Sequence, residues 1–358
     1  MGVFAYYDAE TEGAVYHVIP SPESEQAPSL IDQESTSTGS RITVQSDDLP
    51  GYFVLHHGRQ QPASSNIAKW FPSDNLRRDL LRYVIANSVL GGNYIDLVKE
   101  GLAPVDGRER RVLELGTRTG TWVQAMAAEF PHVQFRSLDI APMMAHIPCR
   151  NIVFEVYDFT EGLMLEDESQ DAVFLNLLLE MVKDYRALVR EVYRVLRPGG
   201  FVHFNDFNPQ FWDPCDTAIP ARRTNPRACH LFGIIRQHLS EFGVDPDTCD
   251  KLPLWLAPGS DLWDKSQKGF ENIHSIVRTY PAHPHEGFPC MDQIDAKIAP
   301  YAKHLGIQAW KDGIGLLKDS GIDEETAKRL IDGVLEEMAE PRRSGVVKLY
   351  YIYATKIG

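Results

Sequence analysis

Residues whose side chains or backbone could bind a small ligand directly follow four short apolar runs of the sequence. They are Glu114, Gly116, Thr117, Arg118 and Gly120 in and after the first run, Asp139 and Ile140 at the end of the second, Asp158 and Phe159 after the third, and Asn176 and Leu177 after the fourth. Apolar runs that alternate with helical segments predict a parallel sheet, and ligands bind outside the carboxyl ends of its strands. We therefore expect these residues to surround one ligand.

The chemistry of these residues fits an adenosine. Asp139, at the end of the second run, can accept hydrogen bonds from both hydroxyls of a ribose. Asp158 can accept from an adenine amino group, and Phe159 can cover the ring. The turn "LGTRTGT" bends the chain into a helix N-terminus, where backbone N–H groups face a ligand.

Other nucleotide-binding turns fit this sequence less well. A dinucleotide turn requires G-x-G-x-x-G, but only Gly116 is in place, with Arg118 and Thr121 at the other two positions. The short-chain dehydrogenase variant would need glycine in place of Trp122, and the Gly-Lys-Ser/Thr of a P-loop is absent. These departures disfavour a nicotinamide oxidoreductase.

The segment 110–206 resembles the class I S-adenosylmethionine-dependent methyltransferases. "VLELGTRTG" is similar to their first motif, E/D-x-G-x-G-x-G, with Arg118 in place of the middle glycine. Asp139, the Asp158-Phe159 pair and "LRPGGFVHF" fall where that family has its ribose acid, its adenine-side acid and the turn after a helix. The stretches "GTRTGTWVQAMAAEFP", "LVREVYRVLRPGGF", "GLLKDSGIDEETAKRLIDGVLEEMAE" and "VVKLYYIYATK" resemble, more narrowly, the fungal LaeA-like group of secondary metabolism.

The resemblance implies S-adenosylmethionine as the cofactor and a small molecule, of secondary metabolism, as the methyl acceptor. It also implies a seven-stranded mixed sheet whose last strand is antiparallel. The guanidinium of Arg118 could pair with the carboxylate at the methionine end of the cofactor. Alternatively, Arg118 points into solvent and only its backbone shapes the turn. The acidic run and Gln-His that the LaeA-like group carries before the core are replaced here by "NLRRDLLRYVI".

The acceptor side of the site is less clearly marked. The polar residues best placed for catalysis, if the acceptor must lose a proton, are His203 on the strand-like run "FVHFNDF" and Asn205 and Asp206 at its end. Of these, His203 and Asp206 are the catalytic candidates. Aromatic residues further along the chain could form a wall for a flat acceptor, but ordinary packing is the more common role; they are Phe211, Trp212, Trp255 and Trp263. Tyr52, His56 and His57 could close over the site, although structural roles are again more common.

No metal site is predicted. "HPHEGFPC" (283–290) offers His283, His285, Glu286 and Cys290, but its prolines and the absence of a second cluster favour a loop.

The elements form an α/β, Rossmann-like core with helices on both faces and several additions. We predict an N-terminal accessory extension of a hairpin and polar linker (1–65), a helical lid (66–105), the S-adenosylmethionine-binding core (106–207), a cap insertion for the substrate (208–270) and a C-terminal part that completes the sheet (271–358). In the lid, Leu76, Leu80 and Val84 should share the buried helical face, with Ser73 or Asp74 as the cap and Gly91 at the end. A second amphipathic helix should begin at Asp323 and bury Ala327, Leu330, Ile331, Val334, Leu335 and Met338.

Composition narrows the class of partner. A formal charge of -14 over 358 residues disfavours nucleic acid and anionic membranes as partners. Five scattered cysteines without a C-x-x-C pair argue against a disulfide framework, and no apolar run is long enough for a membrane span. We expect a cytoplasmic protein, with the nucleus also possible, that acts on a small molecule. A homodimer or protein partner is also compatible, and the alternative function is a LaeA-like regulator that binds the cofactor and acts through protein partners.

Overall fold

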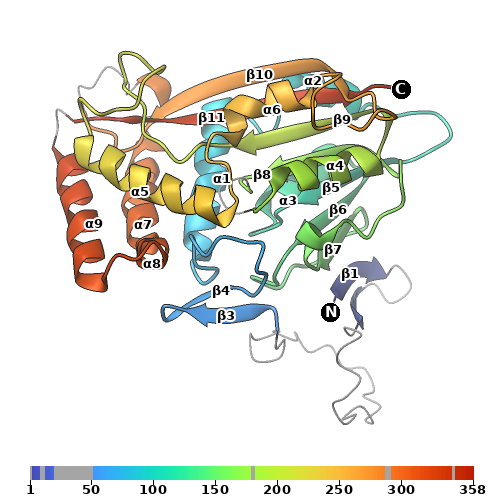
Figure 1. The fold of residues 1–358 in the computed structure, drawn as a ribbon. Coiled ribbons are helices and arrows are strands. Elements are labelled where there is room, and N and C mark those ends of the chain that lie inside the picture. Colours follow the sequence, from blue (N-terminus) through green and yellow to red (C-terminus); the bar gives the residue numbers. More distant parts are fainter. Residues whose placement is uncertain (1, 9–12, 20–50, 179–181, 287–291, 341–342) are drawn as a thin grey trace, which may run out of the picture.

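The computed structural model describes residues 2–8, 13–19, 51–178, 182–286, 292–340 and 343–358 (Figure 1). Its main feature is a nine-stranded sheet with the strand order β10-β11-β9-β8-β5-β6-β7-β1-β2, beside a separate two-stranded sheet, β3-β4. The strands of the large sheet are β1 (Gly2–Asp8), β2 (Gly13–Ile19), β5 (Arg110–Leu115), β6 (Val133–Asp139), β7 (Ile152–Val156), β8 (Gln170–Asn176), β9 (Leu196–Asp206), β10 (Phe270–Pro281) and β11 (Val346–Lys356).

The centre of the sheet is parallel, as predicted. β5 pairs in parallel with β6 and β8, β6 with β7, and β8 with β9, whereas β11 runs antiparallel between β9 and β10. Within this order, the seven strands β10-β11-β9-β8-β5-β6-β7 form a mixed sheet whose last strand in the sequence, β11, is antiparallel, which confirms the prediction. Because all the parallel strands end at the same edge, the polar residues that follow them are brought together.

The predicted N-terminal hairpin is present and extends this sheet. β1 pairs with β2 over Gly2–Asp8 and Gly13–Ile19, and β1 also pairs antiparallel with β7 through Val3, Phe4 and Ala5. The accessory segment therefore contributes two strands to the sheet edge. The polar linker expected at 21–40 lies outside the described residues.

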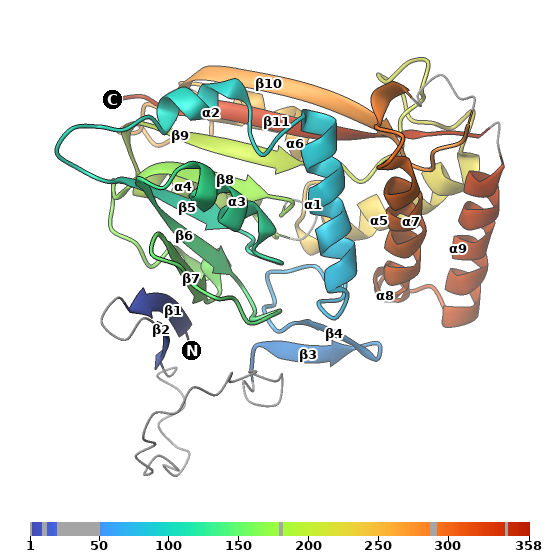
Figure 2. The same ribbon diagram turned by 180° about the vertical axis from the view of Figure 1, so that it is seen from behind.

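Helices cover both faces of the sheet (Figures 1 and 2). One face carries α4 (Tyr185–Val195) and α6 (Thr248–Leu256), and the other carries α1 (Leu76–Leu90), α2 (Asp96–Gly101) and α3 (Thr121–Glu129). Neighbouring residues of β5, such as Val112 and Leu113, are both fully buried, each in the apolar core of a different face. Burial on both faces explains why the central strands are continuous apolar runs rather than alternating patterns.

The predicted buried face of α1 is wrong. Leu80 is 42% exposed, and the buried side chains include Arg78, Leu81, Arg82 and Ile85. The N-cap is Asn75 rather than Ser73 or Asp74, whereas Gly91 ends the helix in a left-handed conformation as expected. The sequence pattern fails here because charged side chains occupy the buried stripe.

A helical layer stands beyond the carboxyl ends of the parallel strands (Figure 1). It consists of α5 (Pro226–Phe242), α7 (Ala299–Asp312), α8 (Ile314–Asp319) and α9 (Glu324–Ala339), packed around a shared apolar core. α9 begins at the cap Asp323 and buries Ala327, Ile331, Val334 and Met338, which confirms the predicted amphipathic helix. Both segments expected as cap (208–270) and as sheet completion (271–358) contribute to this layer, while α6 packs on the sheet instead.

None of the helices in the described ranges has the length and apolar character needed to cross a bilayer.

Glu337 joins two helices of this layer and should contribute measurably to stability. Its carboxylate, on α9, accepts hydrogen bonds from the backbone N–H groups of Arg227 (2.9 Å) and Ala228 (3.0 Å) at the first turn of α5, and the residue is 1% exposed. We predict that Glu337→Ala lowers the free energy of unfolding by about 2 kcal/mol, since it leaves buried helix N–H groups unpaired. Urea denaturation would measure this loss. The exposed neighbour change Glu336→Ala should cost much less, and equal losses would contradict the prediction.

Candidate functional site

The turn between β5 and α3 has an unusual backbone. Gly116, Arg118 and Gly120 all have positive φ angles, of 92°, 48° and 68°. A Cβ atom at Gly116 would meet Leu178 Cδ2 at 2.9 Å and the Asn176 carbonyl oxygen at 3.0 Å, so glycine is required at this position. Arg118 pays a conformational cost of roughly 1–2 kcal/mol for a left-handed backbone, and its contacts must offset that cost.

Asp139 holds the turn from the end of β6. Its Oδ2 accepts a hydrogen bond from the Arg118 backbone N–H (2.7 Å), and its Oδ1 accepts one from the Ile140 N–H (2.8 Å). The side chain is largely buried. Burial raises the pKa of Asp139, while the charge and backbone N–H of Arg118 act in the opposite direction. The turn and the acid at the end of the neighbouring strand thus form one unit.

The Arg118 side chain does not extend into solvent. It is 8% exposed, and its Nη2 donates to the Leu177 carbonyl oxygen at the end of β8 (2.7 Å). Its Nη1 lies 3.7 Å from Asp79 Oδ1 of α1. The structure therefore excludes the solvent-directed alternative and places the guanidinium at the carboxyl edge of the sheet.

Glu114 lies beneath the same turn in a buried polar network. Its Oε2 accepts from the Ser137 hydroxyl (2.5 Å) and its Oε1 from the Asn176 side-chain amide (3.2 Å). Thr117 Oγ1 lies 2.7 Å from Ser137 Oγ, which extends the network to the turn. Burial raises the pKa of Glu114 to about 8. This network links the ends of β5, β6 and β8.

Asp158 and Phe159 follow β7 and have local contacts. Asp158 Oδ1 accepts hydrogen bonds from the backbone N–H (3.0 Å) and hydroxyl (2.5 Å) of Thr160. Asp158 thereby caps a short 3₁₀ turn, Phe159–Glu161. Phe159 is 2% exposed and packs in the apolar core on the α4 face. The structure thus brings Asp158 to the edge, but the ring of Phe159 is covered by other side chains.

The two catalytic candidates lie in different surroundings. His203 is 1% exposed in the core on the α1 face, 5.4 Å from the Phe174 ring between ring centroids, and burial lowers its pKa to about 4. Asp206, at the carboxyl end of β9, accepts the backbone N–H groups of Leu178 (2.8 Å) and Phe207 (3.0 Å). His203 is therefore placed inside the sheet layer, whereas Asp206 fixes the chain after two strands.

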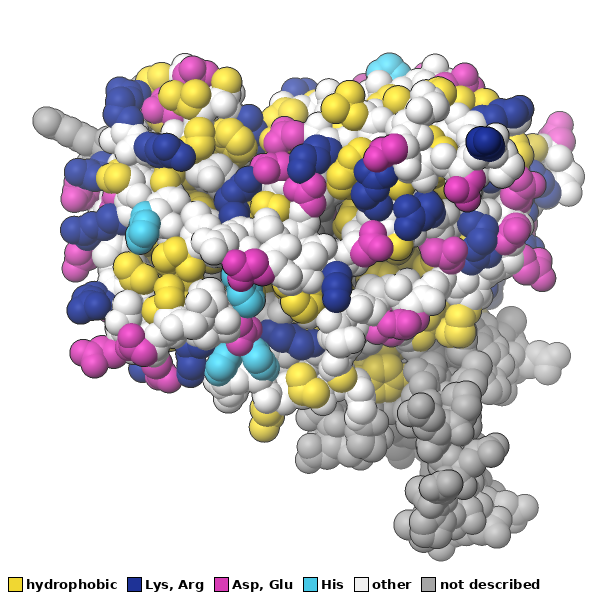
Figure 3. Space-filling view, viewed as in Figure 1, with side chains coloured by type: hydrophobic (Ala, Val, Ile, Leu, Met, Phe, Trp, Pro, Cys, Tyr) yellow, Lys and Arg dark blue, Asp and Glu magenta, His cyan; other side chains and the backbone are white. Residues whose placement is uncertain are grey.

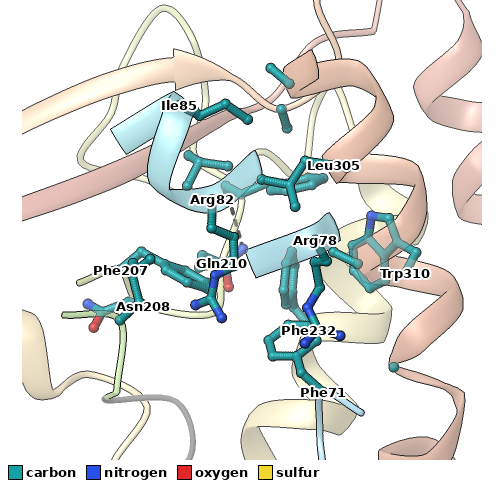
Figure 4. A pocket seen from close by; sticks show the side chains of 18 of the residues that line it. Phe71, Arg78, Arg82, Ile85, Phe207, Asn208, Gln210, Phe232, Leu305 and Trp310 are labelled. Carbon is teal, nitrogen blue, oxygen red and sulfur yellow. Dashed lines mark hydrogen bonds between the residues drawn. The ribbon is translucent and has the colours of Figure 1, made fainter. Parts of the chain in front are cut away.

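A pocket of about 100 Å³ opens next to this edge, between the sheet and the helical layer. Leu177 and Phe207, which directly follow β8 and β9, form one side of it, and the remaining walls are mostly aromatic and aliphatic. In Figure 4, Phe207 and Asn208 lie on one side of the pocket and Phe71, Phe232 and Trp310 on the other, with Arg82 between them. Arg82 lies 5.2 Å from the centroids of both Phe71 and Phe207. Of the predicted wall, only Phe211 lines this pocket.

Sequence reasoning missed three charged residues behind the site. Arg78 Nη1 is 2.8 Å from Asp312 Oδ2 of α7, and Arg78 Nη2 is 3.3 Å from Asp79 Oδ1. Asp79 also faces Arg118, so a chain of buried charges connects α7, α1 and the glycine turn. The sequence signal for Arg78 and Asp79 was their charge within "NLRRDLLRYVI". A helical pattern based on apolar residues places such charged residues on the solvent side.

His146 is a fourth residue that the sequence did not mark. Its Nδ1 would lie 2.8 Å from a Cβ atom at Gly120, and its ring stacks on Phe154 with centroids 4.5 Å apart. Burial lowers the pKa of His146 to about 4. The closeness of this ring explains why position 120 is glycine.

Two further groups of predicted residues have other contacts. His283 Nδ1 is 3.1 Å from His285 Nε2, while Cys290 of the same motif lies outside the described residues. Tyr52 packs in the apolar core on the α4 face, and His56 and His57 contact Asp319 of α8.

The arrangement of the strands identifies the fold. A parallel sheet with a glycine turn after β5, an acid at the end of β6 and an antiparallel strand beside β9 is the Rossmann-like fold of the class I S-adenosylmethionine-dependent methyltransferases. Residues 87–245 match the model of the methyltransferase domain family.

The chain is also similar to proteins with assigned names. The chain is 24% identical over 277 residues to the secondary metabolism regulator laeA of Coprinopsis cinerea. This alignment covers 75% of this chain and 64% of that protein. It is 27% identical over 179 residues to the methyltransferase pytC of Aspergillus terreus. That alignment covers 49% of this chain and 53% of pytC. The chain thus spans between half and two thirds of the length of both relatives. A solved structure of phosphoethanolamine N-methyltransferase 2 from Haemonchus contortus, in complex with S-adenosyl-L-methionine, aligns with a TM-score of 0.42 at 15% identity, over 84% of this chain and 62% of that one.

Glu114 should make stability depend on pH. A folded-state pKa of about 8 means that the folded protein retains a proton that the unfolded chain releases above about pH 4.5, so stability falls as the pH rises through this interval. We predict that Glu114→Gln loses less stability than the wild type as the pH rises from roughly 5 to 8, the interval between the unfolded-state and folded-state pKa values of Glu114. Urea denaturation without ligand measures this difference. The exposed Glu109→Gln should behave as the wild type. Parallel curves for all three proteins would contradict the assignment.

Proposed function

We propose that this protein transfers a methyl group from S-adenosylmethionine to an uncharged, ring-containing small molecule of secondary metabolism. The observation that carries the proposal is the Gly116–Gly120 turn, whose Arg118 N–H donates a hydrogen bond to Asp139. An aromatic pocket lies beside this turn. The family match supports the reaction, and the names of the relatives support the metabolic setting.

The residues at the edge suit the cofactor. Asp139 would accept from the ribose hydroxyls, since each of its oxygens has a second lone pair beyond the backbone hydrogen bond that it already accepts. Ile140, Asp158 and Phe159 would contact the adenine, with a shift of the Phe159 ring. The Arg118 guanidinium, held at the turn by Leu177, would pair with the carboxylate of the methionine end.

The pocket suits an apolar acceptor. Aromatic rings supply most of its surface, and the charge of Arg78 is already balanced by Asp79 and Asp312. A charged acceptor would lose its hydration without gaining a free partner from Arg78. Arg82, the other cation of the wall, lies against the rings of Phe71 and Phe207. Leu177 and Phe207 belong to the pocket wall and directly follow β8 and β9, so an acceptor in the pocket would lie next to the cofactor edge.

The chain's contribution to the reaction would be orientation and the exclusion of water. The bound cofactor supplies an activated methyl group, which an acceptor nucleophile displaces in line. Aromatic walls hold the acceptor at a fixed angle and keep water out, which lowers the entropic part of the barrier. Asp206, at the carboxyl end of β9, is the better placed of the two catalytic candidates, and we propose that it fixes the loops on which Leu178 and Phe207 lie.

The setting of the protein follows from its surface and thiols. Positive and negative side chains are interspersed over the face in Figure 3, which with the net charge of -14 disfavours nucleic acid as the partner. Four free cysteines among the described residues suit a reducing compartment, the cytoplasm or nucleus. A regulatory role through protein partners is the second candidate, because the relative from Coprinopsis cinerea is named as a regulator.

Two variants separate the ribose and carboxylate contacts. We predict that Asp139→Asn weakens binding of both S-adenosylhomocysteine and methylthioadenosine by about 10- to 100-fold, because hydrogen bonds to a charged group are lost. Arg118→Ala should weaken binding of S-adenosylhomocysteine much more than binding of methylthioadenosine, since methylthioadenosine has no carboxylate. Titration calorimetry measures all four affinities, with the exposed Asp167→Asn as the control. Equal losses for both ligands in Arg118→Ala would contradict the carboxylate contact.

The acceptor pocket can be tested without knowing the acceptor. The wild type, incubated with methyl-labelled S-adenosylmethionine and an extract of its host, should place label in a small molecule. Trp310→Ala should reduce this label at least about tenfold, since it removes a large buried contact surface, while S-adenosylhomocysteine affinity stays unchanged. Trp255→Ala, which lies outside the pocket, is the control. Tight cofactor binding with no label in any small molecule would favour the regulatory role.

A further inference from the structure

Three side chains from two distant parts of the chain converge at the surface below the helical layer. His56 and His57 lie at the end of β3 (Phe53–His56), where the chain turns into β4 (Arg59–Pro62), and Asp319 is the last residue of α8. His56 Nε2 lies 2.8 Å from Asp319 Oδ2 and 2.9 Å from Oδ1, and His57 Nε2 lies 2.8 Å from Oδ1. Histidine side chains gather over β3 and β4 on the face shown in Figure 3. We call these three residues the His–His–Asp cluster.

The donor atoms of the His–His–Asp cluster lie close enough together to share one metal ion. One nitrogen from each imidazole and one carboxylate oxygen all lie within 4.8 Å of one another. Zinc bonds to nitrogen and oxygen are about 2.0–2.2 Å long, so neighbouring ligand atoms of a tetrahedral site are about 3.3 Å apart. The observed nitrogen-to-oxygen distances of 2.8 to 2.9 Å need to open by only a few tenths of an ångström.

The backbone presents both imidazoles to the same point. His57 and Gly58 have φ angles of 50° and 79°, so both central residues of the turn between β3 and β4 are left-handed, a conformation in which asparagine and glycine are preferred. In this turn the two rings have centroids 4.3 Å apart at an angle of 58°. The cluster side chains are each 20 to 31% exposed, which leaves access for an ion and for water.

We propose that the His–His–Asp cluster binds a divalent transition metal of the zinc type, with three protein ligands and water completing the coordination. Two imidazoles and one carboxylate favour zinc, cobalt or nickel over magnesium and calcium, which prefer an all-oxygen set. The net charge of -14 also raises the concentration of cations near the surface.

A metal at this position would fasten the β3–β4 hairpin to α8. The hairpin already contacts the end of α7 through Arg59, whose Nη1 lies 3.3 Å from Asp312 Oδ1. Trp70, which follows the hairpin, and Leu317 of α8 both line the aromatic pocket. The metal would therefore join two walls of that pocket, far from the glycine turn in sequence and independent of the cofactor.

Titration of the metal-free, untagged full chain with Zn²⁺ and Co²⁺ tests the proposal. We expect one Zn²⁺ per chain by calorimetry, a higher melting temperature with Zn²⁺, and a visible d–d absorption band with Co²⁺. His57→Ala and Asp319→Asn should each weaken Zn²⁺ binding by roughly 100-fold, the upper range for losing a metal-site partner, and abolish the shift in melting temperature. His285→Ala, which removes the other pair of neighbouring imidazoles described here, should leave Zn²⁺ binding unchanged.

Several results would overturn the proposal. No heat with Zn²⁺ would mean that the two imidazoles only share hydrogen bonds with Asp319. Unchanged Zn²⁺ affinity in both cluster variants would place the ion elsewhere, as would a sulfur-to-cobalt charge-transfer band, because Cys149 and Cys215 are exposed thiols. Circular dichroism of the metal-free variants checks that each is folded, and Asp319→Glu, which keeps the carboxylate, should retain part of the affinity.

Discussion

The side chain and backbone of Arg118 join three elements to the glycine turn at the carboxyl edge of the sheet. The backbone N–H donates to Asp139 after β6, the guanidinium donates to the Leu177 carbonyl after β8, and it also faces Asp79 of α1. A left-handed arginine costs roughly 1–2 kcal/mol, and hydrogen bonds to charged groups contribute about 1.5–3 kcal/mol each. The contacts can therefore offset the strain, and they fix the shape of the turn before any ligand binds.

The rest of the site follows from this arrangement. Asp79 connects Arg118 to Arg78, and Arg78 connects α1 to Asp312 at the end of α7. The same helices, α1 and α7, supply walls of the aromatic pocket. Buried charges thus hold the pocket walls at a fixed distance from the glycine turn, which is what a transfer between two bound molecules requires.

The sequence predicted those parts of the fold in which the burial of apolar side chains alone determines the pattern. Central strands such as β5 are continuous apolar runs because both of their faces are buried, and α9 shows a plain apolar stripe. The prediction for α1 failed because Arg78 and Asp79 are buried by pairing across space with Asp312 and Arg118, which no local pattern reveals. The position of Arg118 could be predicted, but its partners could not, since Leu177 and Asp79 come from elements distant in sequence. The aromatic pocket likewise assembles from several distant segments, so Phe211 alone was anticipated.

A crystal structure of the protein with S-adenosylhomocysteine bound tests the central claim most directly. The account predicts that the ribose hydroxyls lie within hydrogen-bonding distance of the Asp139 carboxylate, and that the amino-acid end lies beside the Gly116–Gly120 turn with its carboxylate toward Arg118. Electron density for the ligand at any other place in the fold would contradict it.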